Sequence, residues 1–290
     1  MQDPVMAPRH EETATWEGQL RLQFDRKGQG TRLARSYQQA PLKILSPYYP
    51  EGPGICHAVT LHNAGGIVGG DRLAIEVAVG AGSHAAVTSA SAGKIYGSPG
   101  REARQVTRLT VAQEAGLEWL PQESIAFDGA WFRQDLVVNL APGATFLGWE
   151  VVRFGRTARG EGFYRGQWRA TTEVWQAGKP LWIDRQQLLG SPASWESLQG
   201  LAGEPVVGSM ALIGKAVSAE EAQAVRGLWR GDGEAGVTRL PAGLLCRYRG
   251  GSSAEAFGWF LETWRLLRPG SASRRLYRPV SWQACEDLII

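Results

Sequence analysis

A glycine-rich segment at residues 62–71, with the sequence HNAGGIVGGD, constrains the fold of this 290-residue chain more than any other. Gly65 and Gly70 have the spacing of a phosphate-binding P-loop, but Asp71 stands where that motif requires lysine. A dinucleotide-binding loop would open a helix, whereas residues 72–80 place larger apolar side chains at every second position. The pattern therefore predicts a turn that leads into a β-strand and argues against a nucleotide-binding loop.

The position of Asp71 relative to that strand raises a question about its carboxylate. Asp71 is in phase with Leu73 and Ile75, so an unbroken strand would point it toward the apolar face. A buried carboxylate without partners is costly, and this one must be hydrogen-bonded, paired, or in contact with water or a cation. Capping of the turn through glycine N–H groups is one solution, and a bulge at Gly69–Gly70 that resets the register is another.

Most of the remaining chain has the composition of β-strands. Segments rich in β-branched and aromatic residues, bounded by glycine or proline, predict strands at 104–111, 131–140, 145–154, 163–176 and 181–189. Residues 177–180 form a predicted hairpin connection. Three strand junctions, at 79–82, 111–116 and 140–144, resemble one another at an uneven spacing of about thirty residues. We expect a mainly β fold of stacked hairpin layers, β-sandwich-like or β-helix-like, rather than a strict solenoid.

Two helices are predicted near the C-terminal end. Ser218–Glu221 has the pattern of a capping box and opens a helix that runs to about Trp229. Residues 252–255 repeat the pattern before an amphipathic segment at 253–267, which Pro269–Gly270 would end. Its apolar face either packs on the sheets or docks a partner, and the candidates for a partner surface are Phe257, Trp259 and Trp264.

Composition and charge narrow the class of protein. The net charge is +3 and the arginines alternate with acidic residues, which argues against a nucleic-acid partner. No apolar stretch is long enough to span a bilayer, and the first residues do not have the pattern of a signal peptide. Three widely separated cysteines do not suggest a disulfide framework. We expect a cytoplasmic protein with a disordered tail at 1–15 and a single all-β domain at 16–290.

Several catalytic and metal-binding patterns are missing from the sequence. There is no Gly-x-Ser-x-Gly motif and no cysteine pair with zinc-ligand spacing. His57 and His62 would face opposite sides of an extended strand, so they are not expected to share a metal with Cys56. These observations favour a non-enzymatic binding or scaffold protein.

Acidic residues beside glycine turns are the main remaining chemical feature. Carboxylates combined with carbonyls and water give a weak environment for a divalent cation, although each carboxylate could instead pair with a neighbouring arginine. Glu123 and Glu150 belong to this group, and the candidates for cation contact are Asp71, Asp128, Glu161 and Asp184.

A series of short motifs spans nearly the whole chain after the tail. They are residues 40–43, the 62–71 loop with Gly65, Gly66, Gly69 and Gly70, the segment from Thr88 through Lys94 to Tyr96, residues 117–123, the segment from Phe154 through Arg156 to Glu161, and Arg275–Tyr277. In this order they resemble the UreD family of urease accessory proteins, also called UreH. The family usually has glutamine near Ser89–Ala90 and tryptophan at the position of Tyr277, so the match departs at two places.

The resemblance implies an all-β scaffold with a few helices that helps insert nickel into apo-urease. It implies binding to the urease apoprotein on one side and, on the other, to UreF, which carries the GTPase UreG. It also implies an internal passage for nickel. Asp71, Asp128, Glu161 and Asp184 are then predicted to be weak, exchangeable ligands for transient Ni²⁺, with no tightly bound cofactor. The alternatives are a β scaffold for another metalloenzyme and a β-rich hydrolase or sugar-binding protein.

Overall fold

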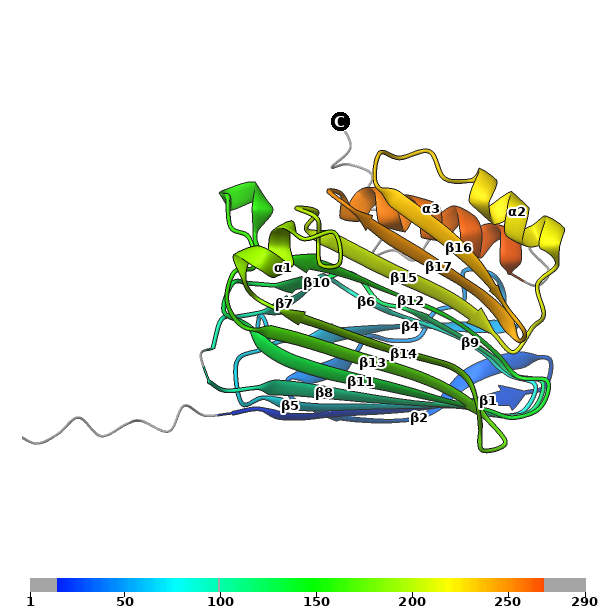
Figure 1. Ribbon diagram of the computed structural model, residues 1–290. Coiled ribbons are helices and arrows are strands. Elements are labelled where there is room, and N and C mark those ends of the chain that lie inside the picture. Colours follow the sequence, from blue (N-terminus) through cyan, green and yellow to red (C-terminus); the bar gives the residue numbers. More distant parts are fainter. Residues whose placement is uncertain (1–14, 99, 269–290) are drawn as a thin grey trace, which may run out of the picture.

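Two large sheets facing each other dominate the computed structural model, which describes residues 15–98 and 100–268 (Figure 1). The seven-stranded sheet has the order β14-β13-β11-β8-β5-β1-β2. Its strands are β1 (Glu17–Lys27), β2 (Gly30–Gln39), β5 (Arg72–Val79), β8 (Ala103–Val111), β11 (Trp131–Leu140), β13 (Gln167–Gln176) and β14 (Lys179–Leu189).

The ten-stranded sheet has the order β16-β17-β15-β12-β9-β6-β4-β3, with β10 and β7 attached beside β12. Its strands are β3 (Leu42–Ile44), β4 (Ile55–His62), β6 (His84–Ser89), β7 (Gly93–Ile95), β9 (Gly116–Leu120), β10 (Ser124–Ala126), β12 (Thr145–Phe154), β15 (Val206–Ile213), β16 (Glu234–Leu240) and β17 (Gly243–Gly250).

The chain coils between the two sheets. From β4 it crosses to β5, returns to β6, and repeats the circuit through β8, β9, β11 and β12 to β13. Successive coils pair in parallel in both sheets, as in β5–β8–β11–β13 and in β4–β6–β9–β12. The result is a β-solenoid of about four turns, closed at the edges by antiparallel strands.

This arrangement confirms a mainly β fold and, of the two expected forms, the β-helix-like one, with successive strands paired in parallel coils rather than in hairpin layers. The junctions at 79–82, 111–116 and 140–144 are the same corner of three successive coils, where the chain passes from one sheet to the other. Their stacking is direct, because Ala112 N–H donates to Val79 O and Ala141 N–H donates to Val111 O. The antiparallel connection predicted at 177–180 is confirmed between β13 and β14, with positive φ at Ala177 and Gly178.

Strand positions agree closely with the sequence pattern. The predicted strands at 131–140 and 145–154 coincide with β11 and β12. The predicted strand at 163–176 begins four residues too early, because residues 163–166 belong to the preceding loop. Period two locates β11, which has one face on the inner core, whereas β12 is located by its apolar and aromatic residues between glycine and proline turns.

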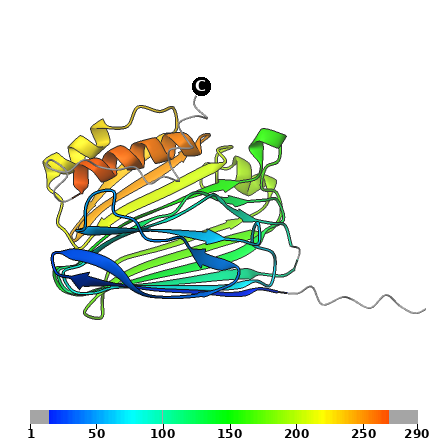
Figure 2. The same cartoon turned by 180° about the vertical axis from the view of Figure 1, so that it is seen from behind.

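Two apolar clusters stabilise the fold. The inner core fills the space between the sheets and includes Phe24, Leu109 and Trp168. The outer cluster lies between the ten-stranded sheet and the helices α2 (Ala219–Gly227) and α3 (Ser253–Leu267), which cover its outer face in Figures 1 and 2. The helix α1 (Pro192–Glu196) and the 3-10 turn η1 (Thr157–Arg159) are short.

Both predicted helices are present, with different N-terminal caps. In α2 the box is complete: Glu221 N–H donates to Ser218 Oγ, and Ser218 N–H donates to the Glu221 carboxylate at 2.8 Å. In α3 only the first half forms, because the Glu255 carboxylate accepts from the Tyr248 hydroxyl instead.

The α3 residues predicted for a partner surface are placed largely in the outer cluster. Trp259 and Trp264 are 3% and 1% exposed, and Phe257 is partly buried. Their apolar side chains pack beneath the helix, against the sheet, rather than facing solvent.

No helix within the described residues has the length and apolar character needed to cross a membrane. Residues 1–14, Pro269–Gly270 and Arg275–Tyr277 lie outside the described residues.

Candidate functional site

The sequence motifs gather at one end of the solenoid, where four successive coils stack. Gly66 has φ +154°, and a Cβ there would overlap the Tyr96 ring. The Tyr96 hydroxyl donates to Gly65 O at 3.3 Å, and its ring meets Phe127 edge-on at 4.9 Å between centroids. The Arg156 guanidinium lies 4.6 Å from the centroid of Phe127 on the next coil. The glycines are thus needed for the close approach of loops that the sequence separates widely.

Three of the four predicted cation ligands instead accept hydrogen bonds that hold these loops together. Asp71 is fully buried and accepts from Trp16 N–H and Val68 N–H, each at 2.9 Å. The carboxylate thus caps the turn, as one of the alternatives above supposed, although neither donor is a glycine.

Asp128 and Glu161 hold the next two coils in the same manner. Asp128 accepts from Tyr164 N–H and Arg165 N–H, each at 2.8 Å, and pairs with the Arg165 guanidinium. Glu161 pairs with Arg156 and accepts from Asp128 N–H at 3.1 Å. These contacts hold the pKa of Asp128 below its ordinary value despite burial, and the Arg156 hydrogen bond does the same for Glu161.

Two adjoining cavities lie between the sheets. One has a volume of about 90 Å³ and the other about 320 Å³. They share the lining residues Gln105, Trp119, Pro121, Gln122, Ser124 and Gln134, so they lie side by side. Asp184 lines the smaller cavity, whereas Asp71, Asp128 and Glu161 are absent from the lining of both.

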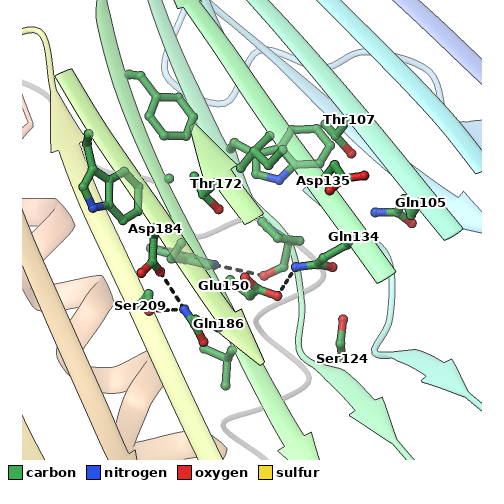
Figure 3. A pocket seen from close by; sticks show the side chains of 18 of the residues that line it. Gln105, Thr107, Ser124, Gln134, Asp135, Glu150, Thr172, Asp184, Gln186 and Ser209 are labelled. Carbon is green, nitrogen blue, oxygen red and sulfur yellow. Dashed lines mark hydrogen bonds between the residues drawn. The ribbon is translucent and has the colours of Figure 1, made fainter. Parts of the chain in front are cut away.

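The polarity arises from inward-facing positions in strands that are otherwise apolar inside. Gln105 pairs with Gln134 across β8 and β11, and Thr172 pairs with Asp184 across β13 and β14. Further along the same strands the inward positions are Leu109, Val138 and Val174. One part of the solenoid interior is therefore a dry core, and the other is lined by amides, hydroxyls and carboxylates (Figure 3).

Glu150, on β12, is the most perturbed group in the smaller cavity. Its carboxylate accepts from the Gln134 amide. Burial raises the pKa of Glu150 to about 7, the negative charge of Asp184 adds to this effect, and Gln134 and Arg247 oppose it. In the sequence Glu150 has the same status as Glu123, because β12 carries apolar residues on both faces and no alternation marks the direction of its side chains.

Asp184 connects Glu150 to the edge where the two sheets meet. Its carboxylate pairs with Arg247 of β17 at 2.7 Å and accepts from Gln186 Nε2 at 2.7 Å. Arg247 also donates to Ser209 Oγ at 2.8 Å. The ion pair thus ties the outermost strand of the seven-stranded sheet to the ten-stranded sheet beside the cavity.

His62, at the end of β4, lines the larger cavity. Within the described part of the chain, neither of its buried ring nitrogens has a hydrogen-bond partner. Burial lowers the pKa of His62, and the nearby charge of Asp71 opposes this effect. A neutral imidazole with free nitrogens can bind a transition-metal ion. His57 lies on the opposite face of β4, as the alternation predicted, and contacts Glu51 at 2.8 Å.

A second cluster of buried charge lies outside the solenoid, beneath the end of α3. Arg268 is 4% exposed and pairs with both Glu51 and Glu118. Glu118 also contacts His84 Nε2 at 2.7 Å and accepts from Trp264 Nε1 at 2.9 Å. Burial alone would raise the pKa of Glu118, but His84, Arg268 and Trp264 lower it to about 2. Here the carboxylates anchor the helix.

Among the described residues, no group of three or more histidine, cysteine, aspartate and glutamate side chains is arranged to hold a metal ion. The interior groups are instead spread along the two cavities, with His62 in one and the Glu150–Asp184 pair in the other.

Comparison with known proteins identifies the family. The family model described as UreD urease accessory protein matches residues 17–283. The chain belongs to the UreD family. It is 52% identical to the urease accessory protein UreD of Nostoc sp. over 268 residues, which cover 92% of this chain and 96% of that protein. It is 40% identical to the UreD protein of Azoarcus sp. over 267 residues, with 92% and 94% covered.

UreD membership agrees with the motif order along the chain, and the fold explains why these motifs are dispersed. Of the family-motif residues, the glycines, Tyr96 and Arg156 build the stacked end, and Lys94 lines the larger cavity. Thr88 has another role: its hydroxyl donates to Leu120 O at 2.7 Å on the outer side of the sheet.

Proposed function

We propose that this UreD chain is a non-catalytic scaffold for urease maturation, and that nickel passes through its polar interior on the way to apo-urease. Family membership supports the role in maturation. The observation that carries the interior route is the pair of adjoining polar cavities between the sheets. The partners we propose are apo-urease, UreF and, through UreF, UreG, in the cytoplasm.

The proposed route uses groups that bind a cation and release it again. Glu150 and Asp184 supply carboxylate oxygens in one cavity, and His62 supplies an imidazole nitrogen in the other. Sites that conduct a cation must attract it without retaining it. With one or two ligands in each cavity, a cation is held more weakly than in a closed site of three or four ligands, so this arrangement meets the requirement better.

Glu150 adds a means of exchange between protons and cations. With a pKa raised to about 7 by burial, the carboxyl is protonated in a substantial fraction of molecules near neutral pH. An entering divalent cation would displace that proton, and departure of the cation would allow it to return. The Glu150 carboxyl can thus be buried in its neutral form while the passage is empty, and it becomes a negatively charged ligand when the cation arrives.

Asp184 remains a ligand candidate in this proposal, whereas the other predicted carboxylates serve differently. Asp71, Asp128 and Glu161 are each engaged by backbone N–H groups or arginine at the stacked end. We propose that they shape the loops beside the passage, and that Asp71 also acts on His62 through its charge.

The first test is reconstitution of urease with and without this chain. Apo-urease, UreF, UreG and Ni²⁺ are combined, and nickel content and urease activity are measured. We expect loading to require the chain. Full loading in its absence would refute the maturation role and leave a scaffold for another client, whereas hydrolysis of a sugar or ester by the isolated chain would favour the enzymatic alternative.

The second test addresses the route. Glu150→Gln and His62→Phe are each expected to lower nickel loading several-fold while binding to apo-urease and to UreF is retained. Glu262→Gln is the matched control, because Glu262 is on the exposed side of α3 and its one ion pair among the described residues is with Arg265. Normal loading by both cavity variants would exclude these residues from the route.

A further inference from the structure

A row of four arginines crosses the outer face of the seven-stranded sheet. In register, Arg72 on β5 is opposite Arg104 on β8, Arg104 is opposite Arg133 on β11, and Arg133 is opposite Arg169 on β13. Their inward neighbours, such as Leu73 and Phe132, belong to the inner core, so the arginines face outward. They lie 32, 29 and 36 positions apart in the chain, and no local pattern in the sequence reveals the row.

This row is unfavourable for folding by itself. Adjacent strands are about 4.8 Å apart, so four positive charges occupy a line of about 14 Å. Like charges directly opposite one another destabilise a sheet. One carboxylate, that of Asp135, pairs with both Arg104 and Arg133. Arg72 donates to the carbonyls of Asp71 and Glu102, and Arg169 is exposed, with no ion pair to any described residue.

The surrounding face has the composition of a protein-binding surface. Four positions further along β8 from Arg104, on the same face, lies another basic residue, Arg108, which is exposed and without an ion pair within the described residues. Tyr37 and Ile183, at opposite sides of the sheet, are 49% and 36% exposed. Arginine and aromatic residues are enriched at the energetic centres of protein interfaces.

No described helix covers this face, whereas α2 and α3 cover the outer face of the other sheet (Figures 1 and 2). The two outer faces therefore differ in kind: one is closed by the molecule's own helices, and the other presents an arginine row to solvent.

We propose that this arginine face is a docking surface for an acidic face of a partner protein. The charge row supplies long-range attraction and a fixed register, because complementary carboxylates would relieve the repulsion between neighbouring strands. Carboxylates also lie within the face, at Glu76 and Glu173. They fit a patterned protein surface better than the uniformly negative backbone of a nucleic acid. The inference rests on the proposed function only in its choice of partners to test.

The test uses the full chain and the double variant Arg108→Glu/Arg169→Glu, since neither side chain forms an ion pair with another described residue whose loss would disturb the fold. Arg239→Glu is the matched control, because Arg239 is an exposed strand arginine of the other sheet. Affinity for apo-urease and for UreF–UreG is measured separately at low and high NaCl.

We expect the double variant to lose about tenfold or more in affinity for one of these partners at low salt, and the wild-type affinity to fall steeply with added salt. The control should match the wild type for both. Unchanged binding of the double variant to both partners would overturn the proposal, as would wild-type binding to a DNA duplex that is tighter than to either protein. Wild-type activation of urease, measured in parallel, tests the maturation role independently of this surface.

Discussion

Two buried glutamates on adjacent strands of the ten-stranded sheet show how the two sides of one sheet differ. Glu118 on β9 faces the helices, and three partners lower its pKa to about 2. Glu150 on β12 faces the interior, and burial beside Asp184 raises its pKa to about 7. The difference is in the partners: an arginine, a histidine and an indole on the outside, and one amide hydrogen bond on the inside.

The comparison separates structural from functional use of a buried carboxyl. The Glu118 carboxylate, whose burial is offset by three partners, stays negatively charged and stabilises the position of α3. A carboxyl group with few compensating partners has a variable charge, which lowers the stability of the folded state when it is present and is available to a passing cation. Perturbed pKa values of this second kind are frequent at functional sites.

The largest expected effect comes from breaking the outer cluster. Glu118→Gln removes the charge shared by Arg268 and His84 and should lower the free energy of unfolding by about 3 kcal/mol, as for one partner of a buried ion pair. Urea unfolding at pH 7 measures this. A loss no larger than that of a surface variant would show that the cluster does not anchor α3.

Acid should act on the same group. Because the pKa of Glu118 is lower in the folded state than in the unfolded state, its contribution is complete above about pH 5 and is lost as the pH falls toward 2. The shift corresponds to about 3 kcal/mol. Urea unfolding of the wild type and Glu118→Gln at pH 6, 4 and 3 should show a difference that shrinks on acidification. A difference that is constant with pH would contradict this origin.

The inner glutamate should respond with the opposite sign. Its pKa is higher in the folded state, so stability is greatest at low pH and falls as the pH rises through about 7. Glu150→Gln removes that penalty and should be more stable than the wild type by up to about 3 kcal/mol at pH 8, and by less than about 1 kcal/mol at pH 5. Thermal unfolding at both pH values is the measurement, and a variant less stable at pH 8 would refute it.

The smallest expected effect is that of an exposed pair. Glu262→Gln removes the contact with Arg265 on the surface of α3, and we expect a change of about 0.5 kcal/mol or less in the free energy of unfolding. A larger loss would mean that charge on the exposed side of the helix matters as much as the buried cluster.

The sequence pattern located the strands because the inner core imposes period two on one face. It did not reveal how the strands pair, since a parallel coil and a hairpin layer place the same alternation in each strand. The corners at 79–82, 111–116 and 140–144 carried the coil repeat, but their uneven spacing left the β-sandwich-like and β-helix-like alternatives both open.

Site prediction was limited by the same lack of pairing information. Asp71 was recognised from its phase with Leu73, and its capping of the turn follows from local geometry. Glu150 lies in a strand that packs on both faces, so the sequence does not indicate to which side its side chain points. The role of Gln134 depends on its hydrogen bond to Glu150 of β12, which lies opposite it in the other sheet. Asp128 and Glu161 were predicted as ligands because they have glycine neighbours. Acidic residues beside glycine are equally common where the carboxylate stabilises a loop corner.

Adjacent residues of the same strands belong to both the interior and the arginine face. Arg104 faces outward and Gln105 inward on β8, and the same is true of Arg133 and Gln134 on β11. A single-residue insertion within either strand would exchange these faces, placing arginine in the passage and amide on the surface at once. An insertion at a corner such as 112–115 would spare both. The length of the central strands is therefore fixed by two independent demands, one from the interior and one from the outer face.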